Sequence, residues 1–185
     1  MAFRNRLRQE ILEAGRVSVE IKEKYFPTDS FEEIRDKLEE LGIDRHTAIE
    51  LESVEIALLT PFGVLMQIRP SDKDQLGMWG GVMEVGETPE EAAIRELQEE
   101  TGITITQDQL LFVEQNPHFH EYANGDKAYF VSNRFIVKFD YVPKIVTDEE
   151  SVGAVMVVHT ILSHQQNFIK RVLGELHSST WFCLW

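Results

Sequence analysis

A helix at residues 89–101 constrains this chain more than any other feature, because the sequence specifies both of its ends. Thr88 is a good N-cap and Glu91, three residues later, completes a capping box. Pro89 occupies the first helical position, where its missing N–H is not needed. Gly102 supplies the left-handed residue that ends a helix. Local chemistry therefore fixes the phase of this helix, and with it the face on which each side chain lies.

Three carboxylates share one face of the predicted helix: Glu96, Glu99 and Glu100 stand at i, i+3 and i+4. Like charges at this spacing destabilise a helix by roughly 0.2–0.5 kcal/mol per pair. Arg95 is the only cation within the helix, and no lysine occurs between residues 74 and 126. Converging carboxylates form a hard-oxygen site suited to Mg²⁺ or Mn²⁺. The alternative is a solvated acidic face.

The residues around this helix match the Nudix box, G-x5-E-x7-R-E-U-x-E-E-x-G-U with U an aliphatic residue, at every specified position. The matching residues are Gly81, Glu87, Arg95, Glu96, Leu97, Glu99, Glu100, Gly102 and Ile103. Composition alone would give such a match with a probability below about one in a million. The chain thus resembles the Nudix hydrolases, more loosely over residues 50–175 and not over residues 1–47.

The resemblance implies a role for each polar residue of the box. The family's metal-binding glutamates correspond to Glu96, Glu99 and Glu100. Glu87 corresponds to a loop glutamate that assists the metal site, directly or through Arg95. For Arg95 we expect a bidentate contact that ties this loop carboxylate to the helix. The alternative for Arg95 is an ordinary i,i+4 pair with Glu91.

Residues outside the helix follow from the same resemblance. Gly80 and Gly81 would let the backbone approach a metal or phosphate closely. Many Nudix enzymes use a further glutamate before a late strand as general base or extra ligand. The segment Asp148-Glu149-Glu150 has a fitting place. Glu149 is our first candidate and Glu150 the second, and a turn with surface acids is the alternative.

Several aromatic and histidine side chains are weaker candidates. On a strand, His118 and His120 would face the same way; two histidines do not make a metal site, and contact with the substrate is their other candidate role. Trp79 and Phe119 are candidates for stacking on a base, although burial is the expected fate of each. Trp79 also stands where the family often has proline before its paired glycines. Pro117 lies near the position of a proline in some ADP-ribose-cleaving relatives.

Periodicity separates an N-terminal helical extension (1–47) from the rest of the chain. The resemblance assigns residues 48–178 to a Nudix domain, which leaves an apolar tail (179–185). In the extension we expect an amphipathic stretch through Leu7, Ile11 and Leu12, a short strand through Val17, Val19 and Ile21, and a helix capped by Ser30 and Glu33. Beyond it we expect strands near 54–58, 64–68, 110–113, 128–139 and 152–158, turns at 61–63 and 124–126, and a last helix from Ser163. Strands clustered around few helices predict an α/β fold, a mixed β-sheet with helices packed on it, and the resemblance to Nudix hydrolases implies an α/β/α sandwich.

Composition narrows the function classes. A net charge of −14 argues against nonspecific nucleic-acid binding, which needs a basic surface. No apolar run is long enough for a membrane-spanning helix. The single cysteine, Cys183, cannot form an intrachain disulfide, so a reducing cytoplasm is the expected compartment.

The function implied by the resemblance is metal-dependent hydrolysis of a diphosphate linkage in a small nucleotide-like substrate. A nucleotide sugar, ADP-ribose and a nucleoside triphosphate remain open as substrates. The alternative is a Nudix-fold module that binds nucleotides without turnover. The N-terminal helices are expected either to form a homodimer or to cap the active site.

Overall fold

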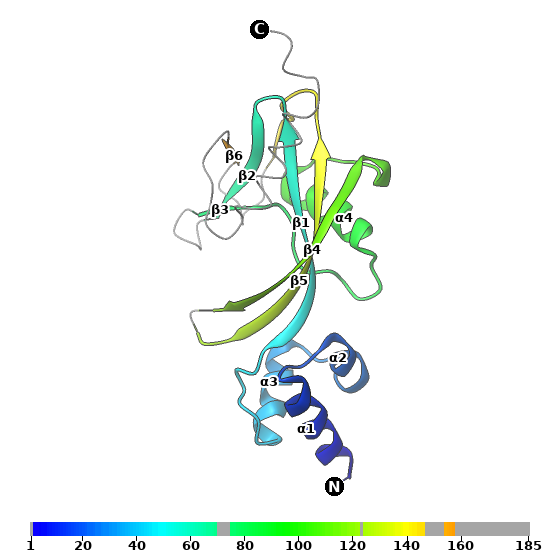
Figure 1. Ribbon diagram of the computed structural model, residues 1–185, viewed down its shortest axis with the longest axis vertical. Coiled ribbons are helices and arrows are strands. Elements are labelled where there is room, and N and C mark those ends of the chain that lie inside the picture. Colours follow the sequence, from blue (N-terminus) through cyan, green and yellow to red (C-terminus); the bar gives the residue numbers. More distant parts are fainter. Residues whose placement is uncertain (1, 70–74, 123, 147–153, 158–185) are drawn as a thin grey trace. The chain divides into compact units, whose positions relative to one another are not determined.

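The computed structural model of the protein describes residues 2–69, 75–122, 124–146 and 154–157 (Figure 1). In chain order the elements are α1 (Ala2–Ala14), α2 (Val19–Tyr25), α3 (Phe31–Glu40), β1 (Ile49–Thr60), β2 (Gly63–Arg69), β3 (Gln75–Gly77), α4 (Pro89–Thr101), a 3₁₀ turn η2 (Gln107–Gln109), β4 (Leu110–Glu121), β5 (Lys127–Lys138) and β6 (Ala154–Val157). The chain divides into two compact units. The first unit holds the described residues of Met1–Glu52 and Gln115–Ser132, and the second those of Ser53–Glu114 and Asn133–Trp185.

The strands follow the order β3-β2-β1-β5-β4, and β6 pairs with β2. β1 and β2 form an antiparallel hairpin that closes at Thr60↔Gly63. In this turn the Thr60 hydroxyl donates to Gly63 O and accepts from the backbone N–H of Phe62. The predicted strands near 54–58 and 64–68 and the turn at 61–63 are thus confirmed.

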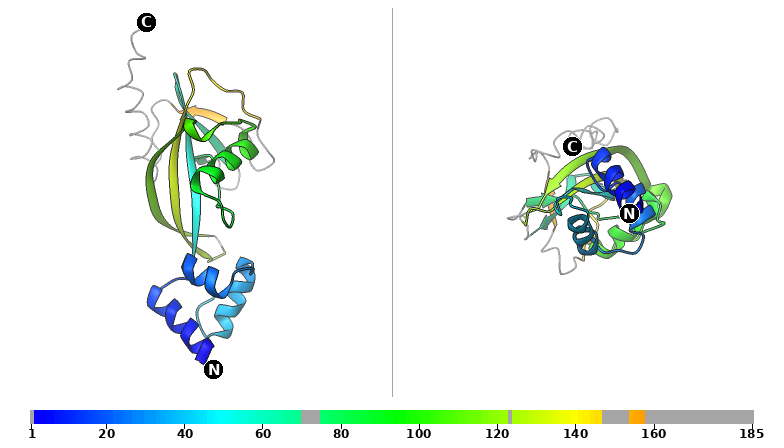
Figure 2. Two further views of the ribbon diagram at one scale, coloured as in Figure 1. Left: turned by 90° about the vertical axis from the view of Figure 1, so that its right-hand side faces the viewer. Right: turned by 90° about the horizontal axis from the view of Figure 1, so that it is seen from below.

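In the second unit, α4 lies along one face of the sheet (Figures 1 and 2). Its Ala92, Ala93 and Leu97 are fully buried and share a core cluster with the inward-facing residues of β1 and with Trp79. The capping box of Thr88 and Glu91 is present, and Gly102 ends the helix at φ 70°. Both predicted ends of α4 are therefore confirmed.

The opposite face of the sheet in the second unit carries its own cluster of buried side chains. Ala57 and Leu59 of β1 belong to it, with Val64, Met66, Met78 and Ile136. The α/β class is confirmed by this arrangement. The second helical layer of the expected sandwich would begin at Ser163, and this helix and the tail 179–185 lie outside the described residues. In the described ranges, no helix has the length and apolar character needed to cross a membrane.

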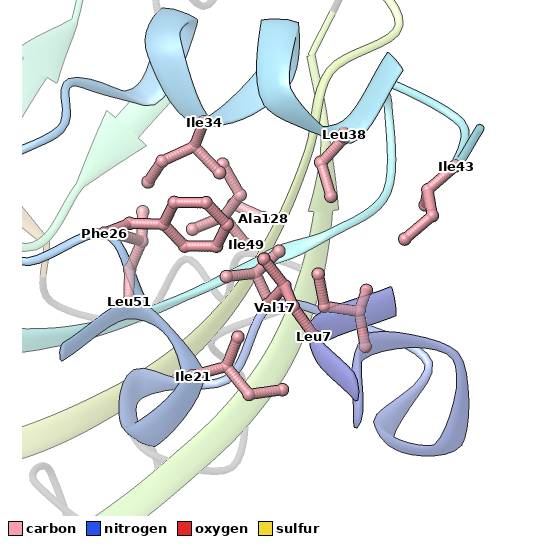
Figure 3. Packing of buried hydrophobic residues seen from close by; sticks show 11 residues of the cluster. Leu7, Val17, Ile21, Phe26, Ile34, Leu38, Ile43, Ile49, Leu51 and Ala128 are labelled. Atoms are coloured by element: carbon pink, nitrogen blue, oxygen red, sulfur yellow. The ribbon is translucent and has the colours of Figure 1, made fainter. Parts of the chain in front are cut away.

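The first unit has a separate core, shown in Figure 3. It gathers buried side chains of the three N-terminal helices with Ile49 and Leu51 of β1 and Ala128 of β5. The predicted capping box of Ser30 and Glu33 opens α3. The N-terminal helices are thus confirmed, and they share one core with two strands.

The prediction of a short strand through Val17, Val19 and Ile21 is wrong, except that Val17 makes a single β-bridge. Val17 makes one parallel bridge with Ile49. The chain then turns into α2, because the Ser18 side chain accepts a hydrogen bond from the N–H of Ile21 and caps a helix. Ile21 is the buried residue of α2. An N-cap therefore overrides three residues of apparent alternation.

Candidate active site

Two carboxylates of α4 meet the backbone at Gly80-Gly81. The N–H of Gly80 donates to Glu100 Oε2 at 2.7 Å. A Cβ built on Gly81 would lie 2.6 Å from Glu96 Oε1, so the Glu96 carboxylate occupies the space that a side chain would fill. Gly80 has a φ of +130°, and a Cβ there would lie 2.1 Å from Val54 O. Close approach thus explains why both positions are glycine.

Arg95 is the cation that ties this cluster together. Its Nε donates to Glu87 Oε1 at 2.7 Å and its Nη2 to Glu87 Oε2 at 2.9 Å, which is the bidentate geometry expected from the sequence. Its Nη1 donates to Glu96 Oε1 at 2.7 Å and to Glu99 Oε2 at 3.1 Å. Nη2 also reaches Val82 O at 3.3 Å. One guanidinium therefore binds three carboxylates and links Glu87 of the loop to Glu96 and Glu99 of α4.

The loop before α4 is held at further points. Glu87 Oε2 accepts a hydrogen bond from the backbone N–H of Glu84 at 2.8 Å. Glu91, the alternative partner of Arg95, instead accepts from the backbone N–H and the hydroxyl of Thr88. Glu91 thus serves as the helix cap, while Glu87 serves as the partner of Arg95.

Burial and charge shift the protonation equilibria of this cluster. The hydrogen bond from Arg95 lowers the pKa of Glu87, and the same contact is the main reason why the pKa of Arg95 is raised. Burial raises the pKa of Glu96, because this effect outweighs the opposing pull of Arg95. The Glu96 carboxylate would therefore gain from a further positive charge nearby.

The fit of a metal ion depends on how these carboxylates are arranged. Within the ranges that the structure covers, no group of three or more His, Cys, Asp or Glu side chains converges on a point that could hold a metal ion. Glu96 and Glu99 turn toward Arg95 instead. The Glu99 side chain is 59% exposed, so it can rotate while Arg95 keeps its contact with Glu87. Carboxylate oxygens are the donors that a hard divalent cation takes, so the three α4 glutamates fit such an ion by their chemistry.

The histidine candidates belong to the first unit. His118 stacks on Phe130 with ring centroids 5.2 Å apart, and His120 meets the edge of Tyr122 at 4.4 Å. Both histidines lie on β4, so they are on a strand, the condition under which they were expected to face the same way. Their ring contacts give each a packing role within the first unit.

Of the remaining candidates, Trp79 is fully buried, and its Nε1 donates to Leu65 O at 3.0 Å. The expectation that Trp79 is buried is confirmed. The same expectation for Phe119 is wrong, since this side chain is 55% exposed on β4, the strand that ends the described sheet order. Glu149 and Glu150 lie outside the described residues.

Sequence reasoning missed the backbone groups of the site. The Gly80 N–H that binds Glu100 and the Val82 carbonyl that binds Arg95 carry no residue-type signal. It also missed Gln67, a buried side chain whose Nε2 donates to Met78 O at 2.7 Å. The available signal for a role of Gln67 was its position as a polar residue among the apolar residues of β2.

Part of the chain matches a family model and two curated relatives. A family model described as NUDIX domain matches residues 50–173. A MutT-like protein of Streptomyces ambofaciens is 40% identical over 72 residues, which cover 38% of this chain and 47% of the relative. An 8-oxo-dGTP diphosphatase of Proteus vulgaris is 49% identical over 51 residues, which cover 26% of this chain and 46% of the relative. The chain thus spans about half the length of these curated relatives.

A solved structure shares the fold. The cocrystal structure of the NUDIX domain of Shewanella oneidensis NrtR complexed with ADP ribose superposes with a TM-score of 0.54. The alignment covers 70% of this chain and 89% of that chain at 16% identity. At this identity the likeness bears on the fold alone.

Proposed function

Because the chain belongs to the NUDIX family over residues 50–173, we propose that it is a metal-dependent hydrolase that cleaves a diphosphate linkage in a nucleoside diphosphate derivative. The observation that carries the proposal is the cluster of α4 carboxylates packed against two glycines with one arginine as the shared cation. Glu96, Glu99 and Glu100 are the proposed ligands of Mg²⁺ or Mn²⁺. A bound divalent cation supplies charge neutralisation and lowers the pKa of a coordinated water.

The other residues of the site prepare this cluster. Gly80 orients Glu100 through its N–H, and Gly81 leaves the space that the Glu96 carboxylate occupies. Both oxygens of Glu87 accept from Arg95, so we assign Glu87 to the metal site through Arg95 rather than as a direct ligand. The general base is proposed to be Glu149, with Glu150 or a box glutamate as the alternative.

The substrate class is proposed from chemistry and from relatives. Anionic carboxylates and an anionic diphosphate come together only when cations lie between them. One relative is named an 8-oxo-dGTP diphosphatase, which favours nucleoside triphosphates, and the family resemblance leaves ADP-ribose and nucleotide sugars open. We therefore propose nucleoside triphosphates, ADP-ribose and nucleotide sugars as the classes to test. The cytoplasm remains the proposed compartment, because the chain has a single cysteine.

Turnover of a substrate panel tests this function. ADP-ribose, nucleotide sugars, dinucleoside polyphosphates and nucleoside triphosphates are incubated with Mg²⁺ or Mn²⁺, and release of phosphate or mononucleotide is measured. Glu99→Gln and Glu100→Gln are expected to lower kcat by about 10²-fold or more, the usual effect of removing one electrostatic stabiliser. Glu90→Gln is the matched control, since it removes one carboxylate from the first turn of the same helix.

Three outcomes decide between the hydrolase and the non-catalytic module. Loss of turnover in both variants with an active Glu90→Gln supports the hydrolase. A Glu99→Gln variant as active as the parent contradicts the proposed role of the glutamates. A parent that binds one of the nucleotides in a calorimeter without hydrolysing any of them favours the non-catalytic binding module.

A further inference from the structure

Residues 78–82 run beside β1 as a short antiparallel segment. Trp79 bridges Ile56 and Val82 bridges Ser53 in one continuous register. The N–H of Ile56 donates to Trp79 O at 2.7 Å, and the N–H of Trp79 donates back to Ile56 O at 3.3 Å. This segment carries the two glycines that contact the α4 carboxylates, so its register decides where they lie.

Two buried side chains fix this segment from the side of β2. The Trp79 indole Nε1 donates to Leu65 O at 3.0 Å, and Gln67 Nε2 donates to Met78 O at 2.7 Å. Trp79 is 0% exposed and Gln67 is 2% exposed. A buried polar group that loses its partner is costly, so both contacts resist any shift of the segment. Trp79 also belongs to the core cluster that seats Leu97 of α4.

The segment has little freedom to move without disturbing the carboxylates. A shift of the segment relative to α4 would disturb the 2.7 Å contact between the Gly80 N–H and Glu100. A shift toward β1 is blocked, since even a Cβ at Gly80 would lie 2.1 Å from Val54 O. The position of Gly81 in turn defines the space left for Glu96.

We propose that Trp79 and Gln67 are positioning residues for the metal site. Their hydrogen bonds to Leu65 O and Met78 O hold the Gly80-Gly81 backbone at the register where it receives the carboxylates of Glu96 and Glu100. This inference rests on the proposed function, because it assigns these two residues to the same carboxylate cluster. Neither residue contacts the reacting atoms; each acts through the glycine backbone.

Three variants separate positioning from stability alone. Trp79→Phe removes the indole donor and keeps an aromatic ring, and Gln67→Met removes the amide donor at similar volume. Ile105→Val is the control, since it trims a buried residue of the same core cluster that is not part of the segment 78–82. Each protein is titrated with Mn²⁺ by electron paramagnetic resonance, its melting temperature is recorded, and kcat and KM are measured on a substrate that the parent hydrolyses.

Trp79→Phe and Gln67→Met are expected to raise the Mn²⁺ Kd by about 10–100-fold, as loss of a supporting contact does at metal sites. They should lower kcat more than they raise KM. Ile105→Val should lower the melting temperature and leave the Mn²⁺ Kd unchanged. If Trp79→Phe does not fold, Gln67→Met alone decides.

Parental Mn²⁺ affinity in a folded Gln67→Met variant overturns the positioning role while leaving the hydrolase proposal intact. The same holds if Ile105→Val weakens Mn²⁺ binding as much as the two test variants do, since the effect then follows stability. A parent that neither binds Mn²⁺ nor hydrolyses any diphosphate overturns the proposed function, and the positioning role with it. The amide resonance of Gly80 gives a further readout without metal, since it should shift in Gln67→Met and stay in place in Ile105→Val.

Discussion

Substituting two neighbouring glycines with alanine should have different consequences. Gly81→Ala should weaken metal binding, whereas Gly80→Ala should destabilise the fold. A Cβ at Gly81 meets the flexible end of the Glu96 side chain, at 2.6 Å from Oε1. A Cβ at Gly80 meets the β1 backbone, at 2.1 Å from Val54 O, and Gly80 also has a φ of +130°. The first clash can be relieved by rotating a carboxylate, whereas the second requires a strand to move.

The structure sets the size of each effect. Gly81 is not among the residues with positive φ, so Gly81→Ala gains about 0.4–1 kcal/mol from the unfolded state and loses about 0.5–1.5 kcal/mol in displacing Glu96 from its rotamer. Its free energy of unfolding should stay within about 1 kcal/mol of the parent's. Gly80→Ala combines backbone strain with overpacking, which together cost about 2–6 kcal/mol. That corresponds to a Tm lower by roughly 4–24 °C.

The assay compares both variants by thermal melting and by Mn²⁺ titration. Gly81→Ala is expected to melt close to the parent and to bind Mn²⁺ about tenfold or more weakly, because the Glu96 carboxylate has been displaced. Gly80→Ala is expected to melt at the lower temperature derived above. A Gly81→Ala variant with unchanged Mn²⁺ affinity would refute the reasoning that Glu96 needs the space at Gly81.

Four further results are expected. Arg95→Lys cannot form the bidentate contact with Glu87, so turnover should fall about 10–100-fold with little change in Tm. Thr88→Ala should cost about 1 kcal/mol of stability by urea unfolding, because it loses the helix cap. The pKa of Glu87 is lowered by Arg95, so this carboxylate adds stability above its ordinary pKa of about 4.3. The stability that the Glu87 carboxylate contributes is lost as the pH falls through its lowered pKa in the folded state. Glu87→Gln should therefore narrow the Tm difference between pH 7 and pH 3. Light scattering of the full chain should give twice the mass of one chain if the N-terminal helices form a dimer, and a single mass would remove that role.

The elements that the sequence predicted well are those whose ends depend on neighbouring residues. α4 has its N-cap, first-turn proline and terminal glycine within a few positions of one another, so its bounds and carboxylate face followed from local chemistry. α3 began at Ser30 for the same reason. The Glu87 contact with Arg95 was also predictable, because the family resemblance pairs the two residues and only the N-cap and the first turns of α4 separate them.

Other features depend on contacts between distant segments. β4 continues to Glu121, although polar residues and Pro117 interrupt its pattern. A strand at the end of the described sheet order tolerates both, since one of its sides needs no ladder partner. The contact of Gly80 with Glu100 joins a loop to a helix, and the contact of Gln67 with Met78 joins a strand to that loop. No local pattern encodes such pairs.

The proposed function requires that the α4 carboxylates hold a divalent cation. A crystal of the full chain soaked with Mn²⁺ and measured at the manganese absorption edge would locate that ion. An anomalous peak is expected about 2.0–2.2 Å from carboxylate oxygens of Glu96, Glu99 or Glu100, with Glu99 turned away from Arg95. A fully occupied manganese peak elsewhere on the chain, with Glu96 and Glu99 still paired to Arg95, would contradict it.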